Sequence, residues 1–253
     1  MIMCRIFLAL ILGFSSALVF TPNAIADIVP YDRARAITPA STVDEVGLTF
    51  LRLAGIQPDF NQLALKASQV RRINPSELDS FLKNEAFRLQ AKYTAFNPKK
   101  DILVLRLEVN LSFFKKEDKT STLKINFPTK GLVYFPYYYA DYPIAFIIND
   151  LESFQDMVLA EDETAIAAAH LGASGKATLM LEINPITADA KTPMKLDRML
   201  QYPLLGNISY IGLLNAQAQH IWAWETPESA KRVHHTRNLG VLGIGSSVAP
   251  VIH

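Results

Sequence analysis

The sequence predicts an α+β protein in which an N-terminal helical segment of about three short helices precedes a mainly antiparallel β-sheet, after a cleaved signal peptide. Two changes of pattern predict this order. Apolar residues repeat with the helical period over residues 41–96 and with the two-residue period of strands from residue 101 onward. The chain has 253 residues, of which 50% are hydrophobic and 19% charged, a composition that excludes a disordered or collagen-like protein.

The first 26 residues have the layout of a secretory signal peptide. Arg5 is their only charge, a mostly apolar run follows over residues 6–20, and Ala24 and Ala26 place small side chains before a cleavage site. The apolar run is shorter than the about 20 residues that a membrane-spanning helix needs. We therefore expect cleavage after Ala26, no transmembrane span in the mature chain, and an extracytoplasmic location, either periplasmic or secreted.

Cleavage would leave a mature chain with balanced charge and no cysteine. Removing Arg5 leaves 24 Lys and Arg against 24 Asp and Glu, and the only cysteine, Cys4, is lost with the leader. A chain without cysteine has no disulfides, no cysteine-ligated zinc and no cysteine nucleophile. Balanced charge argues against nucleic acid as a partner, because nucleic-acid-binding proteins usually carry a basic excess.

The mature chain is expected to contain four segments. They are an extended lead-in over 27–40, a helical subdomain over 41–96, an antiparallel β-rich domain over 97–230, and a basic, then glycine-rich tail over 231–253.

Three helices are expected in the helical subdomain. Ser41 or Thr42 can cap the first helix, and Gly55 can end it. The second helix follows Pro58. The third begins at Asn74-Pro75-Ser76-Glu77, with Asn74 as its cap.

A long hairpin is expected to open the β-rich domain. Apolar side chains alternate with polar ones over 101–113, residues 115–120 are polar, and the alternation resumes over 123–127. Further strands are expected at 132–135, 144–148, 157–160, 177–183, 207–214 and 219–225, and one helix at 163–171. Because consecutive strands lack helical crossovers, we expect an antiparallel sheet of about five to seven strands.

The motifs of common active sites are incomplete or missing. The chain has no Gly-x-Ser-x-Gly and no His-Glu-x-x-His, and the stretch 170–177 lacks the first glycine and the hydroxyl of a phosphate-binding loop. The acidic run 161–163 lacks the spacing of a calcium loop. The sequence therefore assigns no catalytic residue, no metal ligand and no cofactor, and it favours a non-enzymatic protein.

Tyrosine is concentrated in one short segment. Five of the nine tyrosines fall within nine positions: Tyr134, Tyr137, Tyr138, Tyr139 and Tyr142. Tyrosine combines a flat apolar face with a hydroxyl, which suits stacking on a sugar or contact with a protein. The competing interpretation is that these side chains close one edge of the core. A second aromatic group, Trp222 and Trp224, is expected on one strand face together with His220.

Together these patterns predict a secreted or periplasmic module for binding or assembly that recognises a glycan or an envelope protein through the tyrosine-rich segment. Two alternatives stay open. One is a periplasmic or secreted hydrolase whose active site is assembled from distant residues. The other is a membrane-apposed envelope factor held by its N-terminus or its basic tail.

Overall fold

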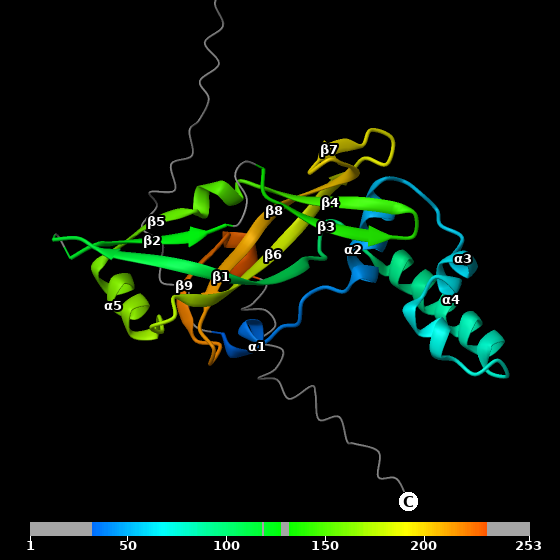
Figure 1. Cartoon of the computed structure of the whole chain (residues 1–253), viewed down its shortest axis with the longest axis horizontal. Coiled ribbons are helices and arrows are strands. Elements are labelled where there is room, and N and C mark those ends of the chain that lie inside the picture. Colours follow the sequence, from blue (N-terminus) through cyan, green and yellow to red (C-terminus); the bar gives the residue numbers. More distant parts are fainter. Residues whose placement is uncertain (1–31, 118, 128–131, 232–253) are drawn as a thin grey trace, which may run out of the picture.

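The computed structural model describes residues 32–117, 119–127 and 132–231. The expected signal peptide and nearly all of the expected C-terminal tail lie outside these residues. Within them the fold is α+β with a large, mostly antiparallel mixed sheet (Figure 1). The helices are α1 (Arg33–Ala36), α2 (Val43–Leu53), α3 (Phe60–Leu65), η1 (Ser68–Arg72), α4 (Leu78–Ala95), η2 (Leu151–Phe154) and α5 (Glu161–His170). The strands are β1 (Leu103–Lys115), β2 (Ser121–Asn126), β3 (Tyr134–Tyr139), β4 (Tyr142–Asn149), β5 (Asp156–Leu159), β6 (Lys176–Ala188), β7 (Met194–Leu196), β8 (Met199–Leu214) and β9 (His220–Glu225).

The sheet is larger than the sequence predicts, and one of its pairs is parallel. Its nine described strands follow the order β3-β4-β8-β6-β1-β2-β5, and β7 and β9 also pair with β8. Every pair is antiparallel except β4 with β8. A parallel pair needs a long connection, and the residues between β4 and β8 supply one that contains α5 and three strands. Prediction from consecutive strands could not detect this pairing.

The hairpin expected at 101–127 is confirmed. β1 pairs with β2 from Asn110↔Asn126 to Lys115↔Ser121, around a polar turn. One face of β1 carries the alternating leucines and valines, of which Leu103, Leu105, Val109 and Leu111 are buried in the main core. The opposite face contributes Val104 to a second, smaller cluster with Met180 and Tyr210. The sheet is therefore apolar on both faces near its middle.

Local capping signals explain where the first long helix begins and ends. Thr42 and Glu45 form a reciprocal capping box at the start of α2. Gly55 follows the helix with a φ of 70°, a left-handed conformation that favours glycine. The expected start of the third helix is wrong by about one turn, since α4 begins at Leu78. Asn74 instead closes a tight turn, in which its carbonyl accepts from the Glu77 backbone amide.

The segment 27–40, expected to be an extended lead-in, contains one helical turn. Asp32 caps this turn, α1, by accepting hydrogen bonds from the backbone amides of Ala34 and Arg35. Ala36 is fully buried and Arg35 nearly so. Burial of these two residues against the sheet holds the turn in place.

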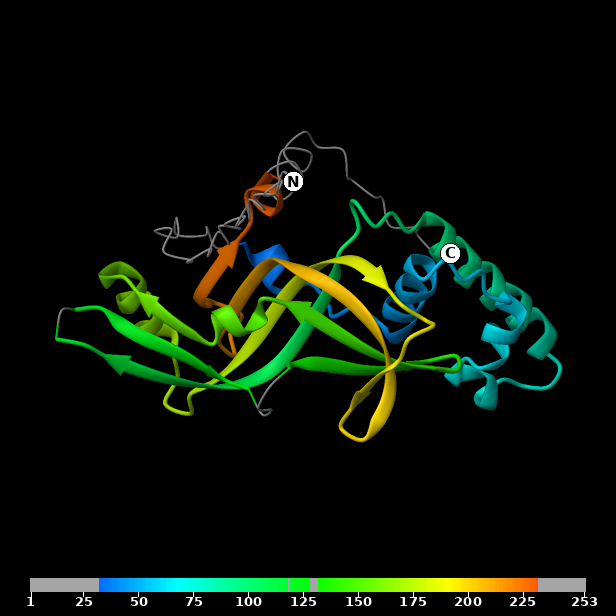
Figure 2. The same ribbon diagram turned by 90° about the horizontal axis from the view of Figure 1, so that it is seen from above.

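Helices α2, α3 and α4 lie at one end of the sheet, and α5 lies at the other end (Figures 1 and 2). α2 packs against β3 and β6, and α4 packs against both α2 and α3. α5 packs on β9 and β5 at the other end. No helix among the described residues has the length and apolar character needed to cross a membrane.

Gly47 of α2 allows the helix to lie close against Tyr139 of β3. A Cβ at this position would lie 2.0 Å from Cγ of Tyr139. We expect Gly47→Ala to lower the free energy of unfolding by about 1–3 kcal/mol, because the ring and the helix would have to move apart. The matched control is Gly172→Ala, where an added Cβ would have no neighbour within 4 Å. Urea denaturation compares them, and equal effects would show that the contact between Gly47 and Tyr139 is not tight.

Candidate functional site: the cavity between the tyrosine hairpin and the helices

The tyrosine-rich segment forms a hairpin made of β3 and β4. β3 is an edge strand, and Pro136 lies in it, consistent with the absence of a backbone donor on proline. The Tyr134 hydroxyl donates to Asp197 at 2.5 Å, which ties the start of β3 to the turn between β7 and β8. Ala140 and Asp141 form the turn of the hairpin, which lies beside the helical segment (Figure 2).

The five tyrosines do not form one exposed surface. Tyr137, Tyr139 and Tyr142 pack against the main core. The Tyr142 ring lies 5.4 Å from that of Phe50 in α2. Tyr138 points away from the core and is 66% exposed. The hairpin therefore closes the core with most of its tyrosines and presents Tyr138 to solvent.

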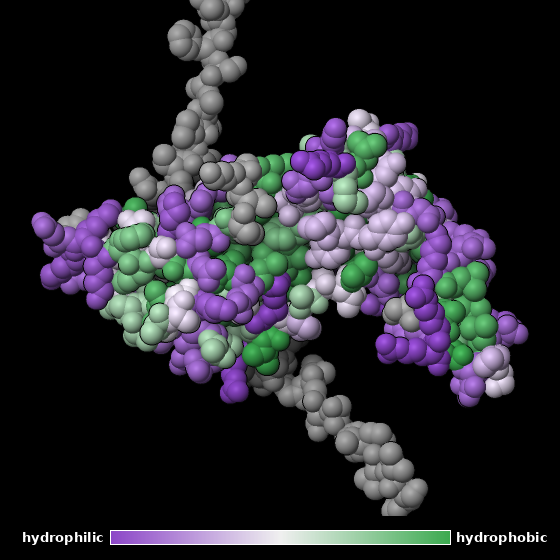
Figure 3. Space-filling model, viewed as in Figure 1, coloured by the Kyte–Doolittle hydropathy of each residue, from purple (hydrophilic) through white to green (hydrophobic). Residues whose placement is uncertain are grey.

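Tyr138 and Tyr139 line a cavity between the hairpin and the helices, which we call the hairpin–helix cavity. Its volume is about 770 Å³, within the range of about 300–1,000 Å³ of pockets that hold small molecules. The apolar part of its wall consists of Val43, Leu63, Leu65, Ala67, Val70, Leu89 and Ala140. The charged part consists of Asp44, Lys66, Arg71 and Glu85. Figure 3 shows apolar surface over α3 and α4, the helices that supply much of this wall.

The hydroxyl of Tyr139 is buried without a hydrogen-bond partner among the described residues. Burial raises the pKa of this hydroxyl, and the negative charge of Asp44 acts in the same direction. The group is therefore a protonated donor at neutral pH. A buried donor without an acceptor costs about 1–3 kcal/mol, so this hydroxyl is a polar group that a ligand could satisfy.

The two carboxylates of the cavity are both paired with Arg88. An Nη2 of Arg88 lies 2.5 Å from an Asp44 oxygen and 2.6 Å from a Glu85 oxygen. The hydrogen bond from Arg88 lowers the pKa of Glu85. A general acid needs a raised pKa, so this arrangement does not favour a hydrolase that uses Glu85 as the acid.

Of the two cations that line the cavity, Lys66 forms an ion pair and Arg71 does not form one with any described residue. Lys66 Nζ lies 2.7 Å from an oxygen of Asp141 in the hairpin turn. Arg71, by contrast, forms no ion pair with any residue that the structure describes. Arg71 is therefore a cation of the wall that has no carboxylate beside it among the described residues.

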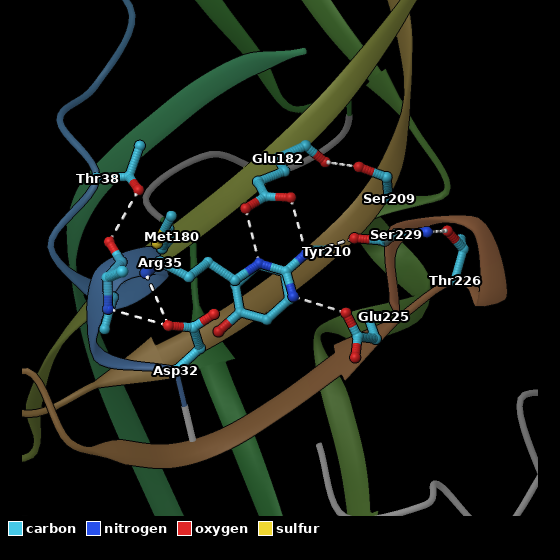
Figure 4. Close-up of polar contacts among 12 residues, drawn as sticks. Asp32, Arg35, Thr38, Met180, Glu182, Ser209, Tyr210, Glu225, Thr226 and Ser229 are labelled. Atoms are coloured by element: carbon cyan, nitrogen blue, oxygen red, sulfur yellow. Dashed lines mark hydrogen bonds and ion pairs between the residues drawn. The ribbon is translucent and has the colours of Figure 1, made fainter. Parts of the chain in front are cut away.

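A second polar cluster surrounds Arg35, on the opposite face of the sheet from α2 (Figure 4). Arg35 donates to both oxygens of Glu182, at 2.7 and 2.8 Å, and to Glu225 at 2.6 Å. It also donates to the Ser229 hydroxyl. Its Cζ lies 3.7 Å from the centroid of the Tyr210 ring. Although burial opposes the charge, the hydrogen bonds of Glu182 and Glu225 raise the pKa of Arg35.

The cluster continues from Tyr210 to two histidines. The Tyr210 hydroxyl lies 2.9 Å from Nε2 of His220, and Nδ1 of His170 lies 2.6 Å from the His220 carbonyl oxygen. Burial lowers the pKa of His220 to about 4, so its ring is neutral at pH 7 and shares one hydrogen bond with the Tyr210 hydroxyl. Because these groups bind one another, we interpret the cluster as a clamp joining α1, β6, β8, β9 and α5, and not as a substrate site.

The expected placement of His220 beside the tryptophans is wrong. Trp222 and Trp224 pack against the main core, with Phe154 as a shared neighbour. His220 instead contacts Tyr210, which belongs to the smaller cluster on the other face. An irregularity between Leu213 and Leu214 shifts the register of β9 and reverses the side on which His220 lies.

The amino-acid sequence revealed the tyrosine-rich segment, but not its hairpin, the rest of the cavity or the Arg35 cluster. Arg35 stands in a segment that the sequence presents as an extended lead-in, and its partner Glu182 lies 147 positions away. At Glu182 the sequence offered one signal of a buried ion pair, which is a charged residue inside an apolar strand. Among the described residues, no group of three or more His, Cys, Asp or Glu side chains is arranged to hold a metal ion.

The chain matches no protein-family model, and comparisons with curated proteins and with solved structures likewise found no match.

Proposed function

We propose that this protein is a non-enzymatic binding module that works outside the cytoplasm and holds a ligand in the hairpin–helix cavity. The observation that carries the proposal is a cavity of about 770 Å³ lined by Tyr139, whose buried hydroxyl has no hydrogen-bond partner among the described residues. Such a group is costly in the free protein. A ligand oxygen that accepts from it would recover this cost on binding.

The neighbourhood of Tyr139 supports this role. Apolar side chains from α2, α3 and α4 offer a surface for the body of a ligand, and Tyr138 supplies an aromatic ring at the rim. Pockets of this kind combine an apolar lining with a few polar groups that orient the ligand. The pairing of Asp44 and Glu85 with Arg88 favours binding over acid catalysis.

Substitution of Tyr138 tests the proposal. We expect Tyr138→Ala to weaken ligand binding by about tenfold, since a stacked aromatic contributes about 0.5–1.5 kcal/mol beyond its buried area. Phe87→Ala is the matched control, because Phe87 is an aromatic of α4 that is 73% exposed and does not line the cavity. Both variants should keep the stability of the parent protein.

The measurement is methyl NMR on protein labelled at leucine and valine, titrated with a panel of short glycans, single-chain amphiphiles and peptides. Binding in the cavity should move the methyl signals of Leu63, Val70 and Leu89 together. If no compound in the panel moves them, or if Phe87→Ala weakens binding as much as Tyr138→Ala does, the cavity is not the binding site.

The location outside the cytoplasm is supported by the leader pattern of residues 1–26. Its test is N-terminal sequencing of protein released from a bacterial host by osmotic shock. The expected mature chain begins at Asp27. A chain that begins at Met1 and stays with the cytosol would contradict this part of the proposal.

A further inference from the structure

We infer that the ligand of the hairpin–helix cavity is a single-chain anionic amphiphile, bound with its acyl chain against the helices and its carboxylate at Arg71. This inference rests on the proposed function and adds the chemical class of the ligand.

The apolar wall favours a chain over a sugar. Seven of the thirteen residues that line the cavity are aliphatic, and two of these, Leu63 and Leu89, are buried. Contact between aliphatic side chains and an apolar ligand favours binding, because the surface of the side chains and the surface of the ligand are both removed from water. A sugar would instead need several polar partners for its hydroxyls, but the carboxylates of Asp44 and Glu85 are already bound to Arg88.

A cation without an ion pair favours an anion at its own position in the cavity. Lys66 is paired with Asp141, and Asp44 and Glu85 share the single guanidinium of Arg88. Arg71 is exposed and forms no ion pair within the described part of the chain. A guanidinium presents a planar set of donors that matches a carboxylate. An amphiphile is the ligand that uses an apolar wall and one guanidinium together.

Tyr139 lines the same cavity, and its buried hydroxyl, which has no partner among the described residues, is the second polar group that we assign to the ligand. Tyr139→Phe removes the donor and keeps the ring. We expect this variant to be at least as stable as the parent, because it removes an unsatisfied buried group, and to bind the amphiphile severalfold more weakly. A Tyr139→Phe variant that binds with unchanged affinity would show that the hydroxyl does not contact the ligand.

Octanoate and 1-octanol are the probes that test the charge, because they share a chain and differ in the head group. Methyl NMR titration of the full chain measures both affinities. We expect octanoate to bind about tenfold more tightly than 1-octanol, since a hydrogen bond to a charged group is worth about that factor. Arg71→Glu should abolish the difference and leave 1-octanol binding within about twofold of the parent.

Arg72→Glu is the matched control. This substitution changes the charge by the same amount one residue away, and Arg72 does not line the cavity. It should keep the preference for octanoate. Equal binding of octanoate and 1-octanol, or equal effects of the two arginine substitutions, would overturn the anionic class while leaving the cavity as a binding site. If both probes fail to bind but a glycan or peptide moves the cavity methyls, the amphiphile is wrong and the proposed function stands.

Discussion

Replacing Arg35 with methionine is expected to lower the free energy of unfolding by about 3–5 kcal/mol, the largest effect of any substitution considered for this protein. Arg35 is 7% exposed, and its nitrogens are bound to Glu182, Glu225 and Ser229. Methionine preserves much of the volume but leaves the carboxylate of Glu182 buried without its cation. The cost comes from that unpaired charge and much less from the lost packing.

Urea denaturation at pH 7 measures this effect. Arg33→Met is the matched control, since Arg33 lies in the same helical turn but is exposed, and its loss should change the free energy by less than about 0.5 kcal/mol. Adding Glu182→Gln to Arg35→Met should recover part of the loss, because the buried group is then neutral. If Arg35→Met costs no more than Arg33→Met, the buried clamp does not contribute to stability.

Acidification should destabilise the protein through His220. The folded pKa of His220 is about 4, against an ordinary value of 6.5. Above pH 6.5 the ring is neutral in both states, so it adds no pH dependence. Between pH 6.5 and 4 the unfolded chain binds a proton that the folded chain excludes, so stability falls as the pH falls. The shift corresponds to a loss of up to about 3 kcal/mol.

The measurement is the free energy of unfolding between pH 4 and pH 7 for the parent and for His220→Gln. Glutamine cannot titrate, and its amide oxygen can accept from Tyr210. The difference between the two profiles removes the contribution of the carboxylates that titrate in the same range. We expect the parent to lose more stability than the variant on acidification. Parallel profiles would show that folding does not lower the pKa of His220.

The parts of the fold that could be predicted from sequence depend on near neighbours along the chain. The alternation over 101–127 predicted β1 and β2, because a strand with one buried face must repeat every two residues. Ser41 or Thr42 as the cap and Gly55 as the stop predicted the ends of α2, because capping uses groups within one turn of the helix. These features required no knowledge of the tertiary structure.

Two features that the sequence did not predict correctly, the pairing of β4 and the position of His220, depend on how strands pair in the sheet. The parallel pairing of β4 with β8 joins strands that are far apart in sequence, and hydrophobic periodicity carries no information about which strand lies beside which. The position of His220 depends on an irregular pairing of β9 with β8, which reverses the side reached by one residue. Neither feature has a signal in the local pattern.

The candidate site shows the same division. The cluster of tyrosines was visible in the amino-acid sequence, and so were the residues that form the helices beside it. The packing of the hairpin against α2 decided which tyrosines are buried and which is exposed. The tertiary structure also placed Tyr138 and Tyr139 in one cavity with Arg71. The physical reason is that a periodic pattern specifies which side of an element avoids water, whereas the contacts of a side chain depend on which other elements cover that side.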